Sequence, residues 1–188
     1  MSEKPAVVRA LHGDHVNLAK VLDAIERQMT ARTAGHEPDY DLVHDAIDYC
    51  LHFPDIYHHP LEDAVFARLR AREPWVAKGL FDLAAEHRDL ADLTRRFGEA
   101  VQRVLLEEEV ARDALDHLAR EFLDRYRQHI GVEESMFLPA AMRALGPEDW
   151  TAIEAEMTAH EDPLFGAAEI RRFNALRHDI LAWANEGK

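Results

Sequence analysis

The chain has 188 residues, 47% of them apolar and 31% charged, with a formal net charge of −14 at pH 7. This length can bury the core of one domain, which we expect to span residues 1–188, while the acidic balance argues against nucleic acid and anionic membranes as partners. The sequence lacks an apolar run near the roughly 20 residues that cross a bilayer and an apolar signal segment, and it has one cysteine, Cys50, so it predicts a cytoplasmic protein.

Apolar residues recur at helical spacing along the chain and predict an all-α protein. Residues 1–8 are expected to form a loose lead-in. The first predicted helices cover, in chain order, about residues 11–29, 41–72, 75–107 and 112–144. Pro54 and Pro60 fall inside the second pattern, and because each lacks a backbone donor we expect a kink or break there.

One or two additional helices are expected at the C-terminal end, in an extension over about residues 147–188. Gly146 and Pro147 end the fourth helix, and Pro147 also suits the first turn of a fifth. The fifth helix carries Trp150 and His160 on its apolar stripe, and a last amphipathic segment follows.

The motif His58-x3-Glu62 places an imidazole and a carboxylate on one helical face, because residues four apart stack about one turn apart. Such a pair suits a transition metal. Alone it is a weak signal in a chain with 12 His and 36 acidic residues. A second copy, His129-x3-Glu133, strengthens it, since both copies follow H-x3-E-[DE]-x2-F.

The motif belongs to an internal repeat with a period of about 72 residues. His15 and His87 lie in similar L-x2-[DE]-H-x2-L segments, so we expect each half to be a helix with one inward histidine followed by a helix with an inward H-x3-E. Two such hairpins predict a four-helix bundle with pseudo-twofold symmetry. Because buried carboxylates need compensating charge, the repeat also predicts two metal ions bridged by Glu62 and Glu133.

These elements, in this order and spacing, resemble the hemerythrin-like family, also called the HHE cation-binding domain. The segments HFPDIYHHPLEDAVF and QHIGVEESMFLP are similar to the signature segments of that family. The resemblance covers roughly residues 8–165 and implies an up-down-up-down bundle over about 8–145. It further implies a non-haem diiron centre, with an oxo or hydroxo bridge and one open position for O2, NO or peroxide.

The sequence departs from the oxygen-carrying members on the third helix, where they supply two histidines four residues apart. Here Leu83 lies four residues before His87 and Ala91 four residues after it. Either His160 supplies the missing ligand or the site stays more open. The predicted metal ligands are therefore His15, His58, Glu62, His87, His129, Glu133 and His160.

Three neighbouring side chains have other expected roles. Tyr126 lies one turn before His129 and is expected to contact the ligands without binding the metal, and so to orient them. His59 follows His58 on a different helical face and is expected to be exposed. His12 points to the side of His15.

The sequence thus favours a metal- and gas-binding protein over a dedicated enzyme, with a role in oxygen, nitrosative or oxidative stress response or sensing. The alternatives are a diiron redox enzyme, a protein that donates iron to damaged iron–sulfur clusters, and a structural bundle that binds zinc or no metal. Spacing alone also accommodates zinc or manganese in place of iron.

Overall fold

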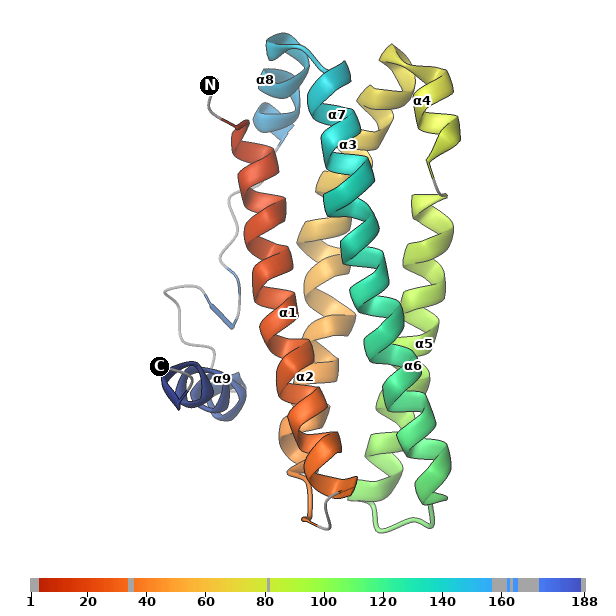
Figure 1. The fold of residues 1–188 in the computed structure, drawn as a ribbon, viewed down its shortest axis with the longest axis vertical. Helices are drawn as coiled ribbons and strands as arrows, with labels where there is room; N and C mark the ends of the chain where they lie inside the picture. The colour runs from red at the N-terminus through yellow and green to blue at the C-terminus, as the bar shows by residue number, and fades with distance from the viewer. Residues whose placement is uncertain are drawn as a thin grey trace.

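The computed structural model describes residues 4–33, 36–80, 82–156, 162, 164–165 and 173–186. These residues form helices and no strand (Figure 1). The elements are, in chain order, α1 (Ala6–Thr33), α2 (Tyr40–Phe53), η1 (Pro54–His58), α3 (His59–Arg72), α4 (Pro74–Gly79), α5 (Leu83–Leu105), α6 (Arg112–Val132), η2 (Glu133–Phe137), α7 (Leu138–Ala144), α8 (Pro147–Glu156) and α9 (Asn174–Glu186).

Four long helical rods form the body of the molecule, and each runs antiparallel to the one before it (Figure 1). The π-helical turns η1 and η2 join α2 to α3 and α6 to α7, so that each of these sets is one rod. The rods α1 and α5 each pack against both α2 and α6. This arrangement confirms the predicted all-α, up-down-up-down four-helix bundle with additional C-terminal helices.

Two helix starts differ from the sequence prediction. The predicted lead-in over residues 1–8 extends too far, because α1 begins at Ala6 and buries Val7 and Val8. The third helix is divided, since α4 ends at Gly79 and α5 starts after Asp82. The carboxylate of Asp82 accepts a hydrogen bond from the Ala85 amide at 3.1 Å and so caps α5.

The apolar core consists of two clusters with a polar layer between them. One cluster includes Leu18, Phe53 and Leu90, and the other includes Leu11, Leu61 and Leu83. The predicted histidine ligands on the described helices lie in the chain between members of the two clusters, as His15 does between Leu11 and Leu18 on α1. Each of the four rods therefore carries polar side chains at the same height in the bundle.

The C-terminal helices pack on the outside of the bundle. α8 contacts α1 and α3, whereas α9 crosses α1 and α2 (Figure 1). Leu176 and Ile180 bury their side chains in the larger apolar cluster, and Arg27 donates to Asp179 at 2.6 Å. The predicted fifth helix is described only as far as Glu156, so His160 lies outside the described residues. That residues 1–188 form one domain stays a prediction.

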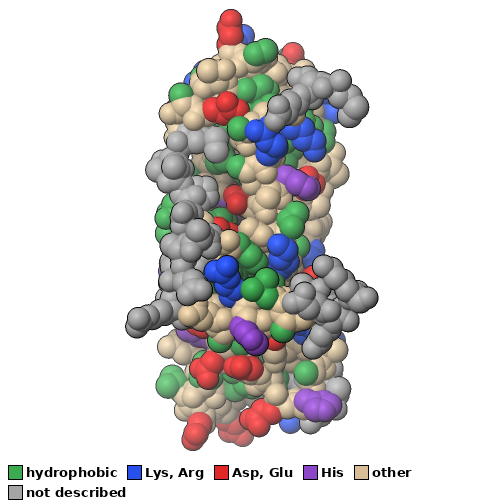
Figure 2. All heavy atoms as spheres, turned by 90° about the vertical axis from the view of Figure 1, so that its left-hand side faces the viewer, with side chains coloured by type: hydrophobic (Ala, Val, Ile, Leu, Met, Phe, Trp, Pro, Cys, Tyr) green, Lys and Arg blue, Asp and Glu red, His purple; other side chains and the backbone are tan. Residues whose placement is uncertain are grey.

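None of the described helices is both long enough and apolar enough to cross a membrane. Figure 2 shows the face that carries α9. Within the described part of this face, acidic and basic side chains lie among apolar ones, and the basic groups do not merge into one continuous patch.

Candidate metal centre

The polar layer brings together six of the seven side chains that the sequence predicts as ligands. All six are buried, and neither Glu62 nor Glu133 exposes any surface. They come from all four rods: His15 from α1, His58 and Glu62 from the η1–α3 junction, His87 from α5, and His129 and Glu133 from the α6–η2 junction. The seventh, His160, is outside the described residues.

Both H-x3-E motifs lie at π-helical turns. The amide of His59 donates to the carbonyl of Pro54, five residues earlier, and the amide of Leu138 donates to Glu133 in the same way. Such turns interrupt α-helices and occur often at functional sites. The break predicted near Pro54 and Pro60 is therefore a π turn within a continuous rod.

Tyr126 supports the first of these turns. Pro54 has no N–H to donate to the carbonyl of Cys50 four residues earlier, and the buried Tyr126 hydroxyl donates to that carbonyl at 3.3 Å. A direct role of Tyr126 toward the ligands stays a prediction.

One group of potential ligand atoms comprises His15, His58, Glu62 and Glu133, all within 4.8 Å of one another. The Nε2 atoms of His15 and His58 are 3.0 Å apart. His15 Nε2 lies 3.2 Å from Glu133, and His58 Nε2 lies 3.4 Å from Glu62.

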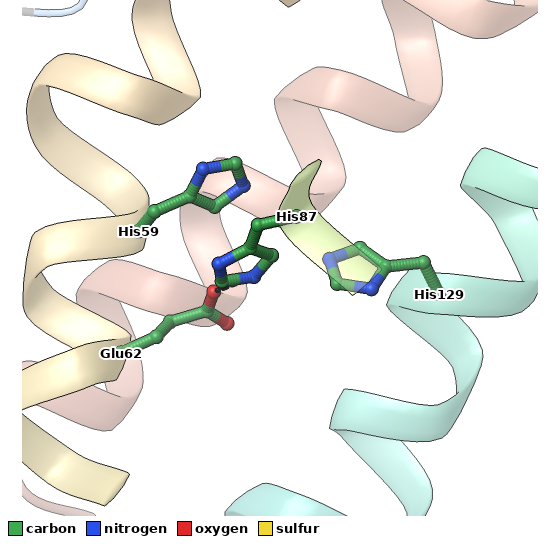
Figure 3. A group of neighbouring side chains, drawn as sticks. All are labelled: His59, Glu62, His87 and His129. Atoms are coloured by element: carbon green, nitrogen blue, oxygen red, sulfur yellow. Dashed lines mark ion pairs between the residues drawn. The ribbon is translucent and has the colours of Figure 1, made fainter. Parts of the chain in front are cut away.

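The other group comprises His59, Glu62, His87 and His129, again within 4.8 Å (Figure 3). His87 Nε2 is 3.3 Å from Glu62 Oε2. The His59 ring stacks on the His87 ring at 3.6 Å between centroids. The interpretation of His59 as an exposed residue is wrong, because only 13% of its side chain is accessible.

In three histidines of these groups the Nδ1 atom lies within hydrogen-bonding distance of a carboxylate. The pairs are His15 Nδ1 with Glu134 at 2.7 Å, His58 Nδ1 with Asp14 at 3.2 Å, and His59 Nδ1 with Asp55 at 2.9 Å. Because an ionised carboxylate only accepts, Nδ1 carries a proton, and whenever such a ring is neutral its Nε2 lone pair points into the site. Metal-binding histidines are commonly oriented by such partners.

Only partial signals for these carboxylate partners are present in the sequence. Asp55 lies four residues before His59, which is a helical neighbour spacing. Asp14 precedes His15 in the chain but serves His58 on another rod, so its role depends on the packing. Glu134 is 34% exposed and also contacts His12 at 3.0 Å, at the edge of the site.

The buried carboxylates stay ionised because histidines face them. Burial alone would raise the pKa of Glu62, but the charge of His58 outweighs it and lowers this pKa to about 2. Burial also opposes ionisation of Glu133, but the nearby imidazoles of His129 and His15 bring its pKa well below the usual value.

The site shifts the pKa values of its histidines in opposite directions. Burial lowers the pKa of His58 and His87, but attraction to the glutamates prevails and raises these values to about 10 and about 9. His59 instead has its pKa lowered to about 4 by burial and by the neighbouring His87. Without metal, protons on His58 and His87 thus balance the two carboxylates.

The donor set fits metal ions. Among the described residues, no hydrogen bond reaches either carboxylate oxygen of Glu62 or Glu133, or Nε2 of His87. Two nitrogens bound at right angles, each about 2.0–2.1 Å from a metal, lie about 2.9 Å apart. The Nε2 atoms of His15 and His58 already stand at 3.0 Å.

The model of the Hemerythrin HHE cation binding domain matches residues 6–141. This range covers more than half of the chain and holds every described candidate ligand, so the chain belongs to this family. No curated protein and no solved structure shows a significant match. Family and His/Glu clusters together identify a metal-binding helical protein.

Proposed function

We propose that this chain is a non-haem diiron protein that binds O2, NO or peroxide and serves in oxygen, nitrosative or oxidative stress response or sensing. Two irons would supply reversible redox change and an open position for a small ligand. The free, buried Cys50 fits a reducing cytoplasm, where we place the protein.

The observation that carries the proposal is the way the two glutamates divide their oxygens. Glu62 turns Oε1 toward His58 at 3.4 Å and Oε2 toward His87 at 3.3 Å. Glu133 turns Oε2 toward His15 at 3.2 Å and Oε1 toward His129 at 3.0 Å. Each carboxylate thus offers one oxygen to the group of His15 and His58 and the other oxygen to the group of His87 and His129. A bridge between two ions about 3.5–4 Å apart requires this arrangement.

Metal analysis tests the proposal directly. Metal-free protein loaded with Fe²⁺ without air should hold two irons per chain, and after oxidation it should show a near-ultraviolet oxo-to-iron band. Adding O2, NO or peroxide to the reduced form then identifies the ligand from a stable adduct. Zinc as the bound metal, or fewer than one ion per chain, would contradict a diiron centre.

Glu62→Ala and Glu133→Ala should each abolish iron loading, because each removes an oxygen from both sides. Asp63→Ala is the matched control, since Asp63 follows Glu62 directly and is exposed. It should retain two irons. If either glutamate variant loads as the wild type does, the assignment of the bridges is wrong.

A further inference from the structure

We propose that His59 is the fifth histidine of the centre, a ligand on the His87–His129 side, and that Asp55 positions it. This inference rests on the proposed two-metal centre and completes its ligand set. It answers the question left by the third helix, where Leu83 and Ala91 occupy the places of a second histidine.

The π turn explains how two consecutive histidines reach the same site. In a regular α-helix, neighbouring side chains point about 100° apart. A π turn adds one residue to the helical turn, because its hydrogen bonds span five residues in place of four, and so it changes these directions. His58 ends η1 and His59 begins α3. As a result, His58 belongs to the group with His15, while His59 belongs to the group with His87.

The His59 ring has the burial and the contacts of a site residue. It stacks on His87, with 14° between the ring planes, and its centroid is 6.4 Å from that of His129, so to bind one ion together one of the two stacked rings has to turn about its side-chain bonds. Figure 3 shows His59 and Glu62 extending from one helix toward His87 and His129. A potential ligand nitrogen of His59 lies within 4.8 Å of those on all three.

Asp55 fixes which nitrogen is available. Its carboxylate accepts from His59 Nδ1 at 2.9 Å, so the Nε2 lone pair of the neutral ring is free for a metal. Asp55 is itself 56% exposed, so it can be replaced with little effect on packing. It is thus a positioning residue that acts through His59.

The resulting ligand set is asymmetric. His59, His87 and His129 give one side three nitrogens, and His15 and His58 give the other side two. Both sides share Glu62 and Glu133. Metal ions held by these two groups would therefore receive different numbers of nitrogen ligands.

A titration of metal-free protein with Co²⁺, followed by visible absorption and metal analysis, tests this assignment without any activity assay. Wild type should bind two ions per chain. His59→Ala should retain one tightly bound ion and bind the other at least about 100-fold more weakly, and free imidazole should restore the absorption band. Asp55→Asn should weaken the same ion about 10- to 100-fold.

His52→Ala is the matched control. His52 also pairs with an aspartate four residues earlier, Asp48, but 63% of its side chain is exposed. It should bind two ions like the wild type. Circular dichroism checks folding, and the exposed Asp55 variant keeps the test decisive if His59→Ala does not fold.

The outcomes separate the two proposals. If wild type and His59→Ala both bind two ions with the same affinity and spectrum, His59 is not a ligand and the two-metal centre stands. If His160→Ala loses the second ion while His59→Ala keeps it, His160 is the fifth histidine. If wild type binds fewer than two ions, the two-metal centre itself is overturned.

Discussion

Glu62 and Glu133 place two negative charges where neither side chain has any exposed surface. A buried carboxylate costs free energy unless it is paired. Metal ions can provide the pairing, and in the metal-free protein protons on His58 and His87 provide it instead. Metal binding must therefore displace these protons, so affinity should rise with pH where they are lost.

The stability of the metal-free protein should consequently depend on pH in a defined direction. The pKa values of His58 and His87 are raised from 6.5 to about 10 and about 9. Their contribution is present in full below pH 6.5 and is lost as the pH rises through those values. The free energy of unfolding should thus fall by about 1.4 kcal/mol per pH unit for each histidine until its folded-state pKa is reached. The melting temperature measured with a chelator, between pH 6.5 and 10, follows this loss.

The same measurement on metal-loaded protein is the control. Its two carboxylates are paired with metal, so its melting temperature should change much less over this pH interval. A metal-free protein that is equally stable at pH 6.5 and pH 10 would contradict the proton-balanced site.

At the scale of elements, the sequence predicted the rods better than their interruptions. Helical periodicity and the 72-residue repeat were sufficient to predict the four rods and the six described side chains that meet in the polar layer. A regular helical wheel, however, points His59 outward. It contains neither the π turn that brings His59 inward nor the tertiary contact beside that turn, from the Tyr126 hydroxyl to the Cys50 carbonyl. The division before α5 did have a local signal, Asp82 as an N-cap.

Close packing between α2 and α5 gives a prediction at this scale. A Cβ atom on Gly98 would stand 3.2 Å from Ile47 Cγ2, and Ile47 is buried. Gly98→Leu should therefore lower the free energy of unfolding by about 2 kcal/mol through overpacking. Denaturant unfolding measures the change.

Gly13→Ala in α1 is the matched control, because it is exposed and no atom lies within 4 Å of the added Cβ. It should stabilise the protein by up to about 1 kcal/mol, since alanine favours helix over glycine. If the Gly98→Leu variant is as stable as the wild type, α2 and α5 can move apart at this contact without loss of stability.

For the whole molecule, the four-helix bundle carries the candidate metal site, whereas the C-terminal helices pack on its outside. All described candidate ligands lie on the four rods between two apolar clusters. α9 instead covers α1 and α2 from outside. The hydroxyl of Tyr49 adds a further link, donating to Asp162 at 2.9 Å. This division predicts that loosening α9 weakens the fold without emptying the site.

Leu176→Ala tests that division, because Leu176 is fully buried between α9 and the bundle. Removing its side chain should cost about 2–5 kcal/mol of unfolding free energy, the range for a buried leucine that leaves a cavity. Leu181→Ala on the same helix, where the side chain is 51% exposed, should change it by less than about 0.5 kcal/mol. Both variants should still bind two metal ions per chain; loss of one ion from Leu176→Ala alone would mean that the C-terminal segment takes part in the centre.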